Sequence, residues 1–154
     1  MKLYFSLFCS DIEAQLIFYL ALLRMPEAAA SRSPIYRCIQ ASSFEFGFHA
    51  APAYALLGVA DRAPALATYA TQISPVTSYA TFMLGSCSEV DDLTAKATAL
   101  GGRIIKAPYP TYYGQWQAVL ADPENNMFRL SFQGLPEGVM APKLVCEVVE
   151  GQIG

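Results

Sequence analysis

Charged residues are scarce in this sequence. Asp, Glu, Lys and Arg make up 15% of the 154 residues, compared with about 25% in an ordinary soluble domain. The net charge is −3 and the basic residues form no run, so the chain lacks the positive patch that nucleic-acid binding requires. This excludes DNA and RNA as expected partners. A surface with so little charge has apolar area to cover, and we expect a homodimer interface to cover it.

Long apolar runs and paired cysteines are also missing. The longest apolar run near the start is 16–23, well below the ~18 residues that a membrane span needs. Asp11 and Glu13 interrupt the apolar stretch that a signal peptide would keep continuous. We therefore expect a cytoplasmic protein with no membrane partner. The absence of CxxC spacing excludes a zinc ribbon and a dithiol redox motif for the four cysteines, which are Cys9, Cys38, Cys87 and Cys146.

What the chain does contain is an internal repeat. Residues 9–13 (CSDIE) correspond to residues 87–91 (CSEVD), and both segments follow an apolar strand. In this arrangement a serine oxygen caps a helix while the carboxylates favour its positive end, so Ser10 and Ser88 are the predicted N-caps. The predicted helix stops are Pro26 for the first helix and the Gly101-Gly102 pair for the second.

One strand precedes each predicted helix and three strands follow it. The predicted strands of the first copy are 3–8, 29–31, 35–41 and 43–49. Those of the second copy are 79–84, 103–107, 115–121 and 127–132, with a turn at 122–126 before the last. The sequence therefore predicts an α+β fold in which two tandem βαβββ units form a curved mixed sheet.

These units divide a single domain of residues 1–154. The first unit spans 2–49 and the second spans 78–133. A linker at 50–77 is rich in Ala and Pro, and its segments 54–57 and 65–70 have helical composition. A C-terminal extension spans 134–154, in which 142–149 is a predicted strand that could pair with a partner subunit.

Four segments match a known family. They are the strand-turn-strand at 121–130 (ADPENNMFRL), the Phe18-Tyr19 pair in the first helix, and the stretches 101–108 and 114–119. In these segments the chain resembles the vicinal oxygen chelate superfamily, which includes glyoxalase I, bleomycin-resistance proteins and extradiol dioxygenases. With the repeat, the resemblance covers residues 2 to 133. It implies two half-barrels that enclose a small-molecule site, and commonly a dimer, but it does not define the reaction.

The resemblance also implies a divalent metal held by the first and last strands of each unit. The corresponding places are Tyr4, Glu45, Phe82 and Arg129, with Tyr79 or Thr81 instead of Phe82 if the register shifts. A phenol titrates near 10 and a guanidinium is cationic, whereas these metals need three or more donors. His49, the only histidine, lies on the strand face of Glu45 and adds at most a second ligand. We therefore expect no metal and no cofactor.

Strand alternation predicts which residues face the cavity. These are Tyr4, Ser6 and Phe8, then Glu45, Gly47 and His49, and in the second unit Arg129 and Ser131. Glu45 and Arg129 hold equivalent places in the two units, so we expect them to pair or to share a ligand. Loop 109–114 is either a lid or an ordinary hairpin. The predicted ligand-binding residues are Tyr4, Glu45, His49, Arg129, Trp116 and Tyr112.

Three functions are consistent with this pattern. The first is a metal-free protein that binds a small aromatic or cationic compound, as bleomycin-resistance proteins do. The second is an enzyme of the superfamily, which would use an unpredicted metal or acid-base chemistry at Glu45, His49 and Tyr4. The third is a non-catalytic dimeric interaction module, for which we expect a collapsed cavity. The sequence favours the first.

Overall fold

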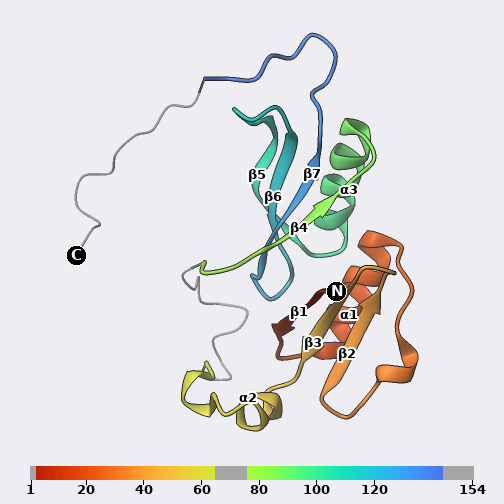
Figure 1. Cartoon of the computed structure of the whole chain (residues 1–154), viewed down its shortest axis with the longest axis vertical. Coiled ribbons are helices and arrows are strands. Elements are labelled where there is room, and N and C mark those ends of the chain that lie inside the picture. Colours follow the sequence, from red (N-terminus) through yellow and green to blue (C-terminus); the bar gives the residue numbers. More distant parts are fainter. Residues whose placement is uncertain (1–2, 65–75, 144–154) are drawn as a thin grey trace, which may run out of the picture.

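The computed structural model describes residues 3–64 and 76–143, which form two units stacked one on the other (Figure 1). The first unit consists of β1 (Leu3–Phe8), α1 (Ile12–Leu23), the 3-10 helix η1 (Ala29–Ser31), β2 (Tyr36–Gln40) and β3 (Phe44–His49). The second consists of β4 (Ala80–Met83), α3 (Cys87–Ala99), β5 (Arg103–Pro110), β6 (Trp116–Ala121) and β7 (Met127–Phe132). Between them lie α2 (Pro52–Leu56) and η2 (Ala60–Arg62).

Each unit has its own mixed sheet. The strand order is β1-β3-β2 in the first sheet and β4-β7-β6-β5 in the second. In both sheets the first strand of the unit runs parallel to its last strand, and the remaining pairs are antiparallel. The predicted α+β fold with tandem units is therefore confirmed. No helix within the described residues is long and apolar enough to span a membrane.

One predicted strand is not formed. Residues 29–31 make the 3-10 helix η1 instead, and the isolated bridges to β2 lie on either side of it, at Glu27–Ile39 and Ser33–Tyr36. The local sequence explains the difference, because Ala has low strand propensity. The first unit is therefore βαββ, whereas the second keeps the predicted βαβββ order.

Both helices begin at a cap other than the predicted serine. Asp11 caps α1 by accepting hydrogen bonds from the backbone N–H groups of Glu13 and Ala14. Ser86 caps α3 by accepting from the N–H of Glu89. The capping chemistry was predicted correctly, but the residue was wrong in each case, by one position for α1 and two for α3.

Two predictions in the connecting segments have different outcomes. The helix predicted at 54–57 is present as α2, which begins earlier because Pro52 suits the first turn. The helix predicted at 65–70 and most of the strand predicted at 142–149 lie outside the described residues.

The core lies between the helices and the apolar faces of the sheets. Alternate strand residues face the helices, and the ring of Tyr19 at 0% exposure packs against Phe46 and Phe48 of the first unit and Phe128 of the second. Helix α1 also contacts α3. The two units therefore share one hydrophobic core.

Candidate functional site

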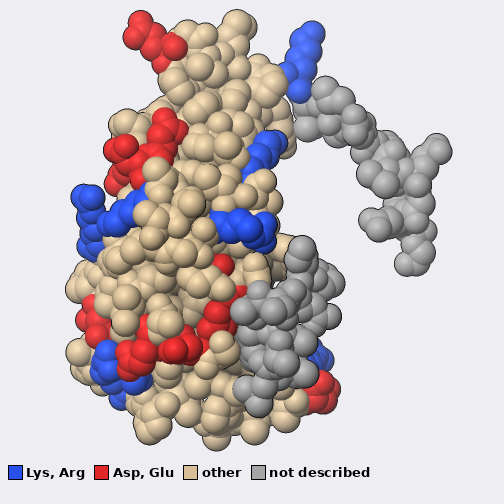
Figure 2. Space-filling view, turned by 180° about the vertical axis from the view of Figure 1, so that it is seen from behind, with Lys and Arg blue, Asp and Glu red and all other residues tan. Residues whose placement is uncertain are grey.

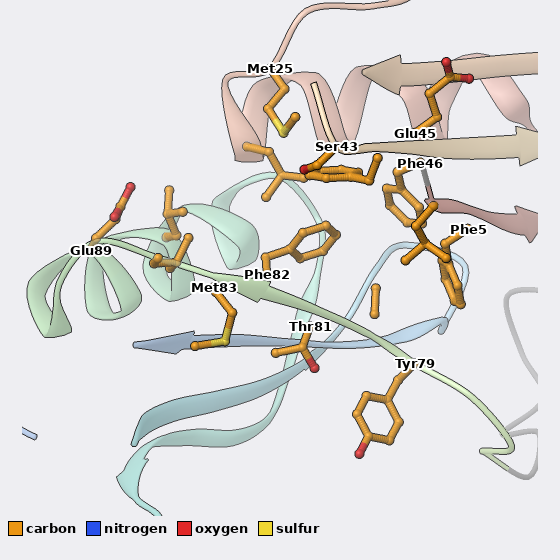
Figure 3. Close-up of a pocket in the computed structure, with 16 residues that line it drawn as sticks. Phe5, Met25, Ser43, Glu45, Phe46, Tyr79, Thr81, Phe82, Met83 and Glu89 are labelled. Atoms are coloured by element: carbon orange, nitrogen blue, oxygen red, sulfur yellow. The ribbon is translucent and has the colours of Figure 1, made fainter. Parts of the chain in front are cut away.

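A cavity of about 640 Å³ lies where the two units meet. Its walls come from β1, β3 and the end of α1 in the first unit, and from β4 and α3 in the second (Figure 3). This volume is typical of a small-molecule site. The aromatic side chains that line the cavity are Phe5, Phe44, Phe46, Tyr79 and Phe82.

The cavity opens on the side of the sheets opposite to the one predicted. Phe46 and Phe82 point toward one another from the two units and pack edge to face at its wall, with ring centroids 5.5 Å apart (Figure 3). Of the predicted lining residues only Glu45 borders the cavity, and its carboxylate points away from Phe82. The prediction assumed that the polar faces of both sheets enclose the site. In the structure β1 and β4 are sheet edges, and the cavity lies at the seam between them.

The strand register identifies the places that correspond to metal ligands in the superfamily. Tyr4 pairs with Glu45 in the first unit, and Thr81 pairs with Arg129 in the equivalent position of the second. Thr81 therefore holds the place for which Phe82 was the first choice. One carboxylate, two hydroxyl groups and a guanidinium do not fit a divalent cation. Within residues 3–64 and 76–143, no three His, Cys, Asp or Glu side chains are grouped as metal ligands would be.

Glu45 lies buried on the polar face of the first sheet, at 8% exposure. The thiol of Cys38 donates to its Oε2 at 3.8 Å. Burial raises the pKa of Cys38, and the nearby charge of Glu45 adds to that shift, so the thiol stays protonated at neutral pH. Tyr36 crosses the same face over Gly47, where a Cβ atom would lie 2.5 Å from the Tyr36 hydroxyl oxygen. Glycine is thus required for the tyrosine to lie against the sheet.

His49 and Tyr4 both lie on this polar face but outside the cavity lining. The His49 ring lies 4.6 Å from that of Tyr36 and 5.8 Å from that of Phe8. Burial lowers the pKa of His49, so the imidazole is neutral at pH 7. Tyr4 is exposed on the edge strand β1. The structure therefore places Glu45 and His49 on one face but does not bring them to the cavity together.

Arg129 is held on the polar face of the second sheet. Its Nε donates to Thr81 Oγ1 at 3.0 Å, its Nη1 donates to the Tyr113 hydroxyl at 3.5 Å, and its guanidinium lies 4.7 Å from the centre of the Tyr79 ring. These are its contacts among the described residues, so the predicted pair with Glu45 is not formed within one chain.

Trp116 and Tyr112 also lie away from the cavity. Trp116 packs against the core, and its indole N–H donates to Asp91 on α3 at 2.8 Å. Tyr112 is exposed in a hairpin turn beside Tyr113. The predicted lid is part of that hairpin, because Tyr109 and Pro110 belong to β5 and Thr111 is hydrogen-bonded to Gln115.

The sequence reasoning missed most of the residues that form the cavity. Phe82 was considered only as a metal-ligand position. Met25 and Leu93, which also line the cavity, were not among the predicted site residues. Their apolar character carried no signal that separates a core position from a cavity wall. The useful clue would have been that β1 and β4 are both edge strands. Strand order, however, is not visible in one sequence.

The fold defines a class of protein with two paired units, one βαββ and one βαβββ, and a cavity at the seam between them. A sequence model of the Glyoxalase/Bleomycin resistance protein/Dioxygenase superfamily matches residues 3–130, and the chain belongs to that superfamily. The resemblance noted from the sequence is confirmed.

Solved structures support the same assignment. A glyoxalase/bleomycin resistance protein/dioxygenase family enzyme from Burkholderia phytofirmans PsJN is 36% identical, with 84% of this chain and 95% of that chain covered and a TM-score of 0.74. A glyoxalase-related enzyme from Fulvimarina pelagi is 18% identical, with 86% and 87% covered and a TM-score of 0.68. Lactoylglutathione lyase from Agrobacterium tumefaciens is 14% identical, with 86% and 92% covered and a TM-score of 0.60.

The last two similarities show the fold alone. No curated protein matches the chain at a significant level.

Proposed function

We propose that the chain binds a small aromatic, cationic compound in the seam cavity without a metal. The observation that carries this proposal is the composition of the cavity wall. Aromatic rings from both units face a space of about 640 Å³, which is the kind of apolar pocket that accepts drug-sized ligands. The rings of Phe46 and Phe82, from opposite units, pack edge to face with centroids 5.5 Å apart, so a flat ligand would lie against this aromatic wall and not between the two rings.

The charges on the cavity wall favour a positive ligand. Its 16 lining residues include Glu45 and Glu89 but no Lys, Arg or His. Glu89 lies at one end of the cavity, whereas the Glu45 carboxylate points away from Phe82 (Figure 3) and accepts a hydrogen bond from Cys38. Glu89 is therefore the carboxylate that counts for a ligand here. Aromatic faces attract cations, and a carboxylate near the mouth of the cavity adds to that attraction. An anion would find no compensating side chain on this wall.

A titration with benzyltrimethylammonium tests the proposal, because this probe combines an aromatic ring with a permanent positive charge. We expect saturable binding of one probe per chain by calorimetry in the presence of EDTA. The variant Ser43→Trp places a large side chain at an exposed position that lines the cavity, and we expect it to weaken binding at least about tenfold.

The matched control is Ser42→Trp, an exposed neighbour that is not part of the cavity wall. It should bind the probe as the unmodified chain does. Absence of binding to the unmodified chain, or equal loss in both variants, would contradict the proposed site.

We further propose that a second copy of the chain covers the outer edge of the second sheet. Strand β5 is the last strand in that sheet, and its first five residues are exposed. Ile104 and Ile105 are 40% and 48% exposed there, and adjacent exposed apolar side chains favour contact with another chain. Uncharged residues also make up most of the face shown in Figure 2.

Sedimentation equilibrium tests this dimer. We expect a dimer at micromolar concentration and a monomer for Ile105→Lys, because the added charge would be buried in the interface. A monomeric unmodified chain would contradict the dimer. The result is separate from ligand binding, which is measured on the variants of Ser43 and Ser42.

An enzyme of the superfamily is the second candidate function. The observation that favours it is the buried Glu45 beside the Cys38 thiol on the polar face of the first sheet, together with a 36% identical relative that is described as an enzyme. Recovery of the bound compound unchanged supports a binding protein, whereas its conversion supports an enzyme. The third candidate, a non-catalytic dimeric interaction module, predicted a collapsed cavity, which the described residues do not show.

A further inference from the structure

A network of polar side chains covers the face of the second sheet that lies opposite α3. The buried amide of Gln117, 2% exposed, is its centre. Gln117 Nε2 donates to the Tyr109 hydroxyl at 2.6 Å, and Gln117 Oε1 accepts from the Tyr113 hydroxyl at 2.8 Å. Both phenols are therefore held in place by one side chain that cannot move without losing two hydrogen bonds.

Two cations stand on the same face. The register aligns Lys106 with Val119 and Val119 with Arg129, so the three residues form a row across adjacent strands. Two strand spacings separate the Cα atoms of Lys106 and Arg129 by about 10 Å. Lys106 Nζ lies 3.6 Å from the centre of the Tyr109 ring, which holds the ammonium beside the phenol network.

Neither cation has a carboxylate partner in the part of the chain that the structure describes. Arg129 uses its Nε toward Thr81 and its Nη1 toward Tyr113. A guanidinium has five N–H donors, so the end formed by its two Nη atoms retains hydrogens without a described acceptor. That end has the spacing that a carboxylate matches with two parallel hydrogen bonds.

The two tyrosine hydroxyl groups supply one further hydrogen-bond donor and no negative charge. The Tyr113 hydroxyl donates a hydrogen bond to Gln117 and accepts one from Arg129. The Tyr109 hydroxyl accepts from Gln117, and no described residue accepts its own hydrogen. Burial raises the pKa of Tyr109, so this hydrogen is retained at neutral pH. The face thus offers the ammonium, the guanidinium end and a phenol O–H, all of which are donors.

We propose that this face of the second sheet binds the carboxylate group of a small molecule between Arg129, Tyr109 and Lys106. The guanidinium end supplies the paired hydrogen bonds, the Tyr109 hydroxyl supplies a third, and Lys106 supplies a second positive charge. This site lies on the polar face of the sheet, and it does not depend on the seam cavity or on what that cavity binds.

A titration of ¹⁵N-labelled full-length chain with benzoate tests the site. We expect saturable shifts of the amide signals of Lys106, Tyr113 and Arg129 and of the Arg129 Nε–H signal. Arg129→Gln should weaken benzoate binding about tenfold or more, since it removes a charge-assisted pair of hydrogen bonds. Tyr109→Phe removes one donor and keeps the ring under Lys106, so it should weaken binding about threefold.

The control variant is Lys96→Gln, which removes one positive charge from α3 on the opposite side of the sheet. We expect it to change benzoate affinity less than about twofold, because a charge on the far side of the sheet is distant and screened by salt. Tyr109→Phe removes only a hydroxyl group, so it keeps the test open if Arg129→Gln does not fold.

Three results would overturn the proposal. They are shifts that grow linearly without saturation, equal benzoate affinity in Arg129→Gln or Tyr109→Phe and in the unmodified chain, and equal loss in Lys96→Gln. Inorganic phosphate provides the second arm. Tighter saturable binding of phosphate than of benzoate at the same signals would overturn the assignment to a carboxylate. Benzyltrimethylammonium should leave these signals in place, which separates this site from the seam cavity.

Discussion

The hydroxyl group of Tyr19 donates a hydrogen bond of 3.0 Å to Oδ2 of Asp122. Tyr19 lies in α1 of the first unit, and Asp122 begins the turn between β6 and β7 of the second. Both are buried, at 0% and 2% exposure. This bond joins the two units inside their shared core, and it therefore fixes the relative position of the two walls of the seam cavity.

Removal of that hydroxyl should be costly. Tyr19→Phe keeps the ring packing but leaves a buried carboxylate without one of its donors, so we expect a loss of about 1–3 kcal/mol in the free energy of unfolding. Urea denaturation measures it. Tyr112→Phe is the matched control, because Tyr112 is exposed, and it should change stability by less than about 0.5 kcal/mol. Equal effects in both variants would contradict the role of the bond.

The same carboxylate should make stability depend on pH. Burial raises the pKa of Asp122 above its ordinary value of 3.8, although hydrogen bonds from Asn126, Tyr19 and the backbone oppose the shift. The folded chain therefore binds this proton more tightly than the unfolded chain. By linkage, the stabilisation that comes from this raised pKa is fully present below the unfolded pKa of Asp122. It is lost as the pH rises through the folded pKa.

Asp122→Asn removes that titration and tests it. As the pH rises above about 4, Asp122→Asn should become more stable relative to the unmodified chain, because only the unmodified chain loses the stabilisation from this proton. Denaturation at a series of pH values measures the difference. A difference that stays constant, or that moves against the variant, would show that the folded pKa is not raised.

Glu124 provides a second link between the units. Its carboxylate accepts hydrogen bonds from the backbone N–H groups of Ser10 at 2.7 Å and Asp11 at 2.9 Å, at the start of α1. Glu124→Ala should cost about 1 kcal/mol, because it leaves a helix terminus without an anionic partner. Glu137→Ala, at an exposed position, is the control. If the two variants are equally stable, this link contributes nothing.

One buried amide opposes stability. Gln15 is 1% exposed in α1, and neither its Nε2 nor its Oε1 has a hydrogen-bond partner among the described residues. Gln15→Leu should therefore raise the free energy of unfolding by about 1 kcal/mol, because it replaces a dry polar group with an apolar one of similar size. Thermal denaturation measures the change. A loss of stability would show that a buried water molecule serves the amide.

Local patterns in the sequence predicted most of the fold. β1 and β7 have the predicted bounds of 3–8 and 127–132, because both are rich in the apolar and aromatic residues that strands favour. The helices were correct in type but began at Asp11 and Ser86, since several acidic and hydroxyl side chains near each start can cap. Residues 29–31 lacked the β-branched side chains that a strand prefers.

The candidate site was harder to predict because it depends on how the two units meet. Alternation predicted that Glu45 and Arg129 both face the cavity, but only Glu45 is among the residues that line it. The sequence could not show that the cavity would open on the apolar side of the seam, where Phe46 and Phe82 meet. It also could not distinguish Trp116 as a core residue bonded to Asp91 from Trp116 as a ligand contact.

The central claim is that the seam cavity binds its ligand without a metal. The direct measurement is calorimetric titration of benzyltrimethylammonium into chain stripped with EDTA, repeated after addition of nickel, zinc, manganese or iron(II). We predict one probe bound per chain with the same affinity in every case. Binding that appears only after a metal is restored would contradict the interpretation of Tyr4, Glu45, Thr81 and Arg129 as a set that does not hold a metal.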